Sequence, residues 1–170
     1  MNSTSKKLFI FALGAAVLIS LSSCQLQDIS SYFVGLQTEP EESLPLPNAG
    51  VHSGQWKTFD LQIDYHYAVE NQSLNISGNI IFGNYYQINF AALRDLEIFL
   101  FFLDKESRVL ETARILRGLG RDLSASRHFE EILAIPESTR AISFGYRGSA
   151  RAERRQQIER FHHLPKHTPD

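Results

Sequence analysis

The chain has 170 residues, with 17 Lys and Arg side chains against 19 Asp and Glu side chains, so its formal net charge at pH 7 is −2. This slightly acidic balance lacks the basic excess of proteins that bind nucleic acids broadly, and we expect no nucleic-acid partner. Cys24 is the single cysteine, which excludes a disulfide within the chain.

The first 24 residues have the parts of a bacterial export signal. Lys6 and Lys7 supply positive charge, and an apolar stretch follows over residues 8–19. Because a membrane span needs about 20 apolar residues, this shorter stretch predicts a signal peptide over residues 1–23 and not an anchoring helix. Removal of the signal would leave a mature chain with a charge of about −4, since Lys6 and Lys7 are lost with it.

The signal ends in an aliphatic residue, two small residues and the cysteine: Leu21, Ser22, Ser23 and Cys24. This sequence resembles the lipobox of bacterial lipoproteins. The resemblance implies that the Cys24 thiol receives a diacylglycerol, that the chain is cut before Cys24, and that the membrane is a partner through the lipid. Gln25 stands where many inner-membrane lipoproteins have an aspartate, so the resemblance favours the outer membrane. An ordinary secretory signal with an unrelated cysteine is the alternative.

Residues 24–55 are predicted to form the lipidated cysteine and a flexible tether, because prolines and glycines interrupt regular structure there and glutamates favour solvation. About 31 residues of such chain average about 30 Å from end to end. Within the tether, four apolar residues have the spacing of a short helix: Ile29, Tyr32, Phe33 and Leu36. This stripe either lies in the membrane interface, docks onto the folded domain, or is disordered.

Residues 56–147 are predicted to form one folded domain, because apolar and polar residues alternate in short runs with turn residues between them. The predicted strands span residues 59–69, 74–82, 85–90, 96–103, 108–116, 129–135 and 141–146. Neither an internal repeat nor an alternation of strands with helices is present. The pattern therefore favours an all-β fold, an antiparallel immunoglobulin-like β-sandwich of about seven strands.

The run from Leu96 to Leu103 is apolar on both faces, with Glu97 as its only charge. A strand of a two-layer sandwich normally has one face in water, so another group should cover the second face. The candidates are the segment near Tyr32 and Phe33, the C-terminal segment, or a protein partner. If nothing in the chain covers it, this face is an interaction surface made by Phe99, Phe101 and Leu103.

The stretch from Phe101 to Asp104, together with the following Val109-Leu110, resembles the middle of small immunoglobulin-like domains in bacterial extracytoplasmic lipoproteins. The resemblance covers about ten residues and implies only the fold. Asp104 begins a turn, where its carboxylate can accept a hydrogen bond from the backbone two residues on.

Residues 148–170 are predicted to form a short polar helix that ends before Pro165, followed by a frayed tail. Arginines and glutamates alternate there, with only Ile158 and Phe161 apolar. The arginines either form a solvated helical face or contact anionic lipid headgroups or acidic glycans.

Two groups of residues are candidates for chemistry. The histidines His162, His163 and His167 have helical spacing, but Pro165 interrupts it, so we expect no bound metal. Asp60, Asp64 and His66 share the polar face of the first strand, where they either form a carboxylate and imidazole site or simply face solvent.

Nothing in the chain has the spacing of a nucleotide loop or of a nucleophile turn. The tyrosines Tyr65, Tyr67, Tyr85 and Tyr86 either stack on sugars or pack in the core. We therefore expect no catalytic residues, no cofactor and no small-molecule ligand.

The sequence as a whole predicts a lipid-anchored cell-envelope lipoprotein that works as a non-catalytic binding, accessory or scaffold module, with an envelope protein as a possible partner. Two alternatives stay open. One is an envelope enzyme or metal-dependent hydrolase that uses the face with Asp60, Asp64 and His66. The other is a passive structural lipoprotein without a specific partner.

Overall fold

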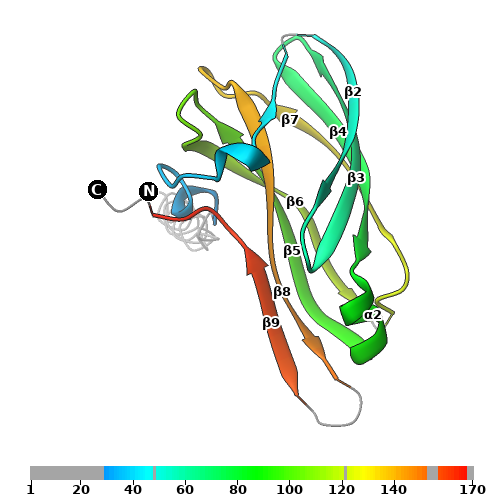
Figure 1. Cartoon of the computed structure of the whole chain (residues 1–170). Coiled ribbons are helices and arrows are strands. Elements are labelled where there is room, and N and C mark those ends of the chain that lie inside the picture. Colours follow the sequence, from blue (N-terminus) through cyan, green and yellow to red (C-terminus); the bar gives the residue numbers. More distant parts are fainter. Residues whose placement is uncertain (1–28, 48, 121, 153–156, 168–170) are drawn as a thin grey trace, which may run out of the picture.

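Two antiparallel sheets pack face to face in the computed structural model of the chain (Figure 1). The structure describes residues 29–47, 49–120, 122–152 and 157–167. The predicted signal peptide, with Leu21, Ser22, Ser23 and Cys24, lies outside these residues. The prediction of an all-β sandwich is confirmed, although the described residues form nine strands instead of seven.

The strands are β1 Leu44–Pro45, β2 Gly50–Lys57, β3 Leu61–Glu70, β4 Ser73–Phe82, β5 Ala92–Leu103, β6 Val109–Gly120, β7 Arg127–Ala134, β8 Ala141–Arg151 and β9 Ile158–His163. Three short helices accompany them: the 3-10 helices η1 Ile29–Tyr32 and η2 Pro40–Glu42, and the α-helix α2 Asn84–Asn89. No helix among the described residues has the length and apolar character that crossing a membrane requires.

One sheet has the strand order β2-β3-β4-β7. In the other sheet β5 lies between β6 and β8, and the far edge of β8 pairs with β1 at its start and with β9 at its end. The orders β3-β4-β7 and β9-β8-β5-β6 correspond to the A-B-E and G-F-C-C′ strands of immunoglobulin-like domains. Seven of the nine strands thus match this fold, and β1 and β2 are N-terminal additions.

The core lies between the sheets and follows the predicted alternation. Every second residue of β3 is buried, and β5 contributes its inward face. The inward residues of these two strands are Leu61, Ile63, Tyr65, Tyr67, Val69, Leu96, Ile98, Leu100 and Phe102. Burial of Tyr65, Tyr67 and Tyr86 supports the packing interpretation of the tyrosines over sugar stacking.

The strand predicted at residues 85–90 is wrong, because this segment forms α2. A helical turn brings Tyr86 and Phe90 onto one face, where their rings stack with centroids 5.3 Å apart and both are buried. Aromatic residues favour strands in general, but here two of them at a spacing of four fill the end of the core.

The two ends of the described chain also differ from the prediction. Residues 24–55 are not a tether throughout, since β2 pairs with β3 along its whole length, from Gly50↔Val69 to Lys57↔Gln62. Residues 148–170 contain no helix in their described part: β8 continues to Arg151, and β9 pairs with it in place of the expected helix. Phe161 explains this choice, because it is buried against Tyr86 with ring centroids 4.9 Å apart.

Candidate functional site

The N-terminal strap, defined here as residues 29–46, crosses the face of the β5–β8 sheet that points away from the other sheet (Figure 1). Backbone hydrogen bonds fix it on both sides. The Gly35 amide donates to Val109 at 2.8 Å, and the Val109 amide donates to Leu36 at 2.8 Å. On the other side, Gln37 and Lys166 exchange two backbone hydrogen bonds of 2.9 and 3.1 Å. The strap therefore fills the space between the start of β6 and the C-terminal segment.

Phe33 of the strap covers the second apolar face of β5. Its ring centroid lies 5.5 Å from that of Phe99 and 5.4 Å from that of Phe101, and Phe99, Phe101 and Leu103 are 0% exposed. The docking alternative for this segment is thus confirmed. The predicted interaction surface made by Phe99, Phe101 and Leu103 is wrong, because the chain itself covers these side chains, and the case for a protein partner here loses its main support.

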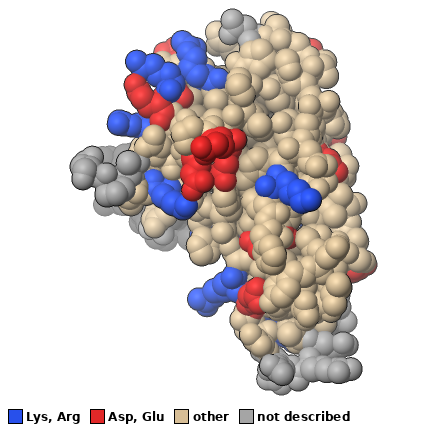
Figure 2. Space-filling view, viewed as in Figure 1, with Lys and Arg blue, Asp and Glu red and all other residues tan. Residues whose placement is uncertain are grey.

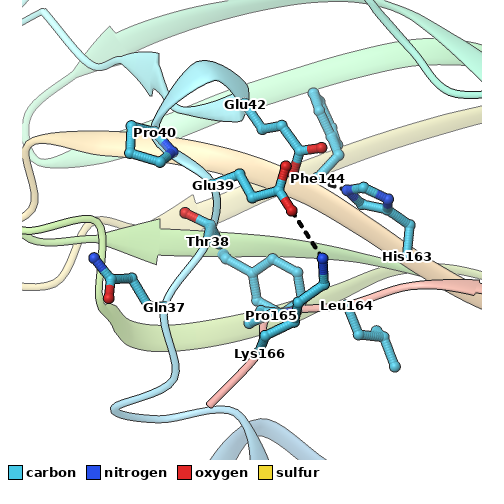
Figure 3. A pocket seen from close by; sticks show the side chains of 11 residues that line it. Gln37, Thr38, Glu39, Pro40, Glu42, Phe144, His163, Leu164, Pro165 and Lys166 are labelled. Atoms are coloured by element: carbon cyan, nitrogen blue, oxygen red, sulfur yellow. Dashed lines mark hydrogen bonds and ion pairs between the residues drawn. The ribbon is translucent and has the colours of Figure 1, made fainter. Parts of the chain in front are cut away.

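One ion pair and one contact between a histidine and a carboxylate join the strap to the end of β9 and the segment after it. Lys166 Nζ lies 2.8 Å from Glu39 Oε1, and His163 Nε2 lies 2.8 Å from Glu42 Oε2. Figure 3 shows the contact between Glu39 and Lys166, which both line a small pocket of about 180 Å³. The hydrogen bond from Lys166 and its positive charge lower the pKa of Glu39, and the same contact raises the pKa of Lys166. These surface contacts position the strap.

Glu97 marks the point where the covered apolar part of this face ends. It accepts hydrogen bonds from Arg114 Nη1 at 2.9 Å and from Arg147 Nε at 2.6 Å. The Arg147 guanidinium also lies over the Phe99 ring, 5.8 Å from its centroid. A mostly buried carboxylate needs such partners, and the arrangement holds Arg147 in a fixed position beside the strap.

Beyond Glu97 the face opens into a hollow of about 730 Å³, which we call the basic hollow. Residues of β5, β8 and β9 line it, chiefly Arg94, Asp95, Arg147, Arg160 and His162. Figure 2 shows more Lys and Arg side chains on the side of the molecule with the strap than over β2 and β3, with Asp and Glu side chains among them. Three guanidinium groups around one opening make it a candidate site for an anion.

The predicted group of Asp60, Asp64 and His66 does not form a site. Asp64 accepts hydrogen bonds from the side-chain amides of Gln55 and Gln62, at 2.8 and 2.9 Å, and His66 pairs with Ser77 at 2.6 Å. Asp60 precedes β3 and belongs to a different environment. The carboxylate and imidazole hypothesis therefore has no support in the geometry.

Asp60 instead joins the two sheets at one end of the core. The Tyr146 hydroxyl donates to Asp60 Oδ2 at 2.7 Å, and the Tyr86 hydroxyl donates to Glu159 Oε1 at 3.1 Å. Burial raises the pKa of Tyr146 and of Tyr86 far above the usual tyrosine value, and the charge of Asp60 raises it further. Both phenols stay protonated at neutral pH and can donate the hydrogen bonds that join these elements.

The histidines likewise have local roles. His163 lies between Trp56 and Tyr146, with ring centroids 5.3 and 5.9 Å away. His162 and His167 border a separate hollow beside Tyr32. In the described part of the chain, no group of three or more His, Cys, Asp or Glu side chains is placed to hold a metal ion.

Sequence reasoning missed the basic hollow, because its residues come from three strands that are distant in the chain. One signal was present: Arg94 and Asp95 are two consecutive polar residues where the alternation requires one. Neither the models of known protein families nor the curated protein sequences gave a match to this chain. Its function therefore has to be argued from its own geometry.

Proposed function

We propose that the protein is a lipid-anchored lipoprotein of the cell envelope, held in the outer membrane through Cys24, that acts as a non-catalytic binding or accessory module. The lipobox residues Leu21, Ser22 and Ser23 and the export signal before them support the anchor. Gln25 supports the outer membrane, as the lipoprotein resemblance implies.

The observation that carries the proposal is the short distance along the sequence between Cys24 and the strap. The strap starts at Ile29, five residues after Cys24, and runs directly onto the outer face of the β5–β8 sheet. Five residues span at most about 18 Å, so an acyl chain on Cys24 would hold this face close to the bilayer. Docking of the strap replaces the long flexible tether with a short link and gives the domain a defined side toward the membrane.

The anchor is tested by the intact mass of the protein purified from its native membranes. We expect the mature chain to begin at Cys24 and to carry the mass of a diacylglycerol, and we expect Cys24→Ala to lose that mass. Ser23→Ala is the matched control, since it keeps a small residue at the lipobox and should leave the lipid in place. A wild-type protein that carries no lipid on Cys24 would overturn the proposal.

A further inference from the structure

The basic hollow owes its shape to a β-bulge in β5. Leu93 and Leu96 are buried, whereas Arg94 and Asp95 between them are both exposed. The pairing register of β5 shifts at this point, between Leu93 and Asp95 on the β8 side and between Leu93 and Leu96 on the β6 side. Bulges re-aim side chains and are frequent beside functional sites. Here the extra residue lets Arg94 and Asp95 point out together while the core alternation continues.

Cross-strand pairing then assembles the hollow in two rows. Asp95 lies opposite Ser149, which lies opposite Arg160. In the next row on the same face, Arg147 lies between Glu97 and His162. Residues that face each other across strands project on the same side of the sheet, so the rows bring charges from three strands to one opening.

The charges in the hollow favour an anion. Asp95 accepts a hydrogen bond from the Ser149 hydroxyl, and Glu97 is shared by Arg114 and Arg147. Among the described residues, Arg94 and Arg160 form no ion pair. Three guanidinium groups and the single carboxylate of Asp95 thus line the hollow, and two of the three guanidinium groups have no acidic partner in the described part of the chain. Guanidinium groups bind phosphate through two parallel hydrogen bonds, which makes phosphate the ligand they fit best.

The position of the hollow points to the source of that phosphate. It opens on the face that the strap crosses, and the strap begins within about 18 Å of Cys24. The apolar residues Ile158 and Leu164 also line the hollow. A phospholipid headgroup combines a phosphate with glycerol and the start of the acyl chains, which suits arginines beside apolar residues.

We propose that the basic hollow binds the phosphate of an anionic phospholipid headgroup in the bilayer that holds Cys24, and that Arg94 and Arg160 are its main ligands. The inference rests on the proposed lipid anchor. It adds a second, reversible contact to the permanent one and fixes which face of the domain meets the membrane.

The test uses the full lipidated protein in an uncharged detergent. It is titrated with dihexanoyl phosphatidylglycerol, with dihexanoyl phosphatidylcholine and with inorganic phosphate, and binding is measured by calorimetry. We expect the phosphatidylglycerol to bind at least tenfold more tightly than either other probe. The double variant Arg94→Gln, Arg160→Gln should lose about thirtyfold of that affinity, since each surface arginine near an anionic headgroup contributes a factor of about five.

Lys57→Gln with Lys105→Gln is the matched control, because it removes the same charge from exposed positions outside the hollow and should bind like the wild type. Arg94→Lys with Arg160→Lys keeps the charge and should retain most of the affinity, which protects the test if the glutamine variant fails to fold.

Equal binding of phosphatidylglycerol and phosphatidylcholine would overturn the inference, and so would equal binding by the glutamine variant and the control. Inorganic phosphate that binds as tightly as phosphatidylglycerol would overturn it as well. The mass of the same sample separates this failure from loss of the anchor: a chain with lipid on Cys24 but no headgroup preference refutes only the hollow.

Discussion

Gly145 lies where β8 passes between β5 and the end of β9, and the space at this residue is too small for a side chain. A Cβ atom there would lie 2.5 Å from the Phe101 ring and 2.7 Å from the His163 carbonyl oxygen. The carbonyl belongs to the backbone and cannot rotate away. The apolar cluster beneath the strap therefore requires glycine at this position, because no side chain larger than a hydrogen atom fits.

We expect Gly145→Ala to lower the free energy of unfolding by roughly 1–3 kcal/mol, the usual range for an overpacked core. Chemical denaturation of the purified protein measures it. Gly118→Ala is the control, because a Cβ there meets its nearest neighbour, a Leu116 methyl group, at 3.4 Å, and its effect should be small. Equal stability of the two variants would mean that β8 and β9 are not packed as closely as described.

Glu97 shows why a charge is tolerated in the most apolar strand. It sits at the end of the apolar face, where Arg114 and Arg147 each donate to one carboxylate oxygen. Removal of one member of such a partly buried group leaves the others without a partner, which is costly. The sequence identified Glu97 only as an exception within an apolar run, because its two partners come from other strands.

The strands were predictable where one face is buried and the other is wet, because alternation then appears directly in the sequence. This holds for β3 and β4, and for the inward residues of β5. It fails for β9, where only Ile158 and Phe161 are apolar and their spacing of three fits a helix as well as a strand. The pairing of β9 with β8 decides the outcome, and such long-range contacts leave no local pattern.

The strap buries one aromatic ring against the β5–β8 sheet. Phe33 is 2% exposed, whereas the neighbouring Tyr32 is 77% exposed. The spacing of apolar residues left three alternatives for this segment, and docking onto the domain is the one that the structure shows. It could not show whether the contact is with the bilayer or with the domain, because both bury the same side chains.

We expect Phe33→Ala to weaken docking of the strap by about 3 kcal/mol, since truncation of a buried Phe costs about 3–5 kcal/mol. Hydrogen exchange at the Val109 and Lys166 amides measures it, because both donate to strap carbonyls, and their protection should fall while that of the β3–β4 hairpin stays unchanged. Tyr32→Ala is the control and should leave all these amides protected. Unchanged protection at Val109 in the Phe33 variant would mean that the side-chain contacts of Glu39 and Glu42 suffice to hold the strap.

At the scale of the whole molecule, the two faces of the β5–β8 sheet have different surroundings. The inner face holds the sandwich together, and the outer face is apolar and strapped at one end and basic and open at the other. The sequence predicted that the apolar part must be covered, because a bifacial apolar strand requires it. It did not predict the basic part, since bulge geometry and cross-strand rows bring those arginines together only in the folded chain.

The link between anchor and strap sets how often the basic hollow meets the membrane, so its length is open to a direct test. Insertion of 20 Gly and Ser residues between Gln25 and Leu26 leaves Cys24 and the strap intact but lengthens the link from about five to about 25 residues. The effective concentration of a tethered site falls with roughly the −3/2 power of linker length, here on the order of tenfold. The same 20 residues added after Asp170 serve as the control.

In vesicles that contain 30% phosphatidylglycerol, we expect hydrogen exchange in β9 to be faster for the long-link variant than for the control, by up to that tenfold factor. In vesicles of pure phosphatidylcholine the two should exchange alike, because the zwitterionic headgroup gives Arg94 and Arg160 no net charge to bind. Equal exchange on both membranes would show that the anchor confines the domain without orienting it. A difference in exchange confined to the anionic vesicles would show that the short link and the basic hollow act together. The link keeps the domain near the bilayer, and the hollow determines which face of the domain meets it.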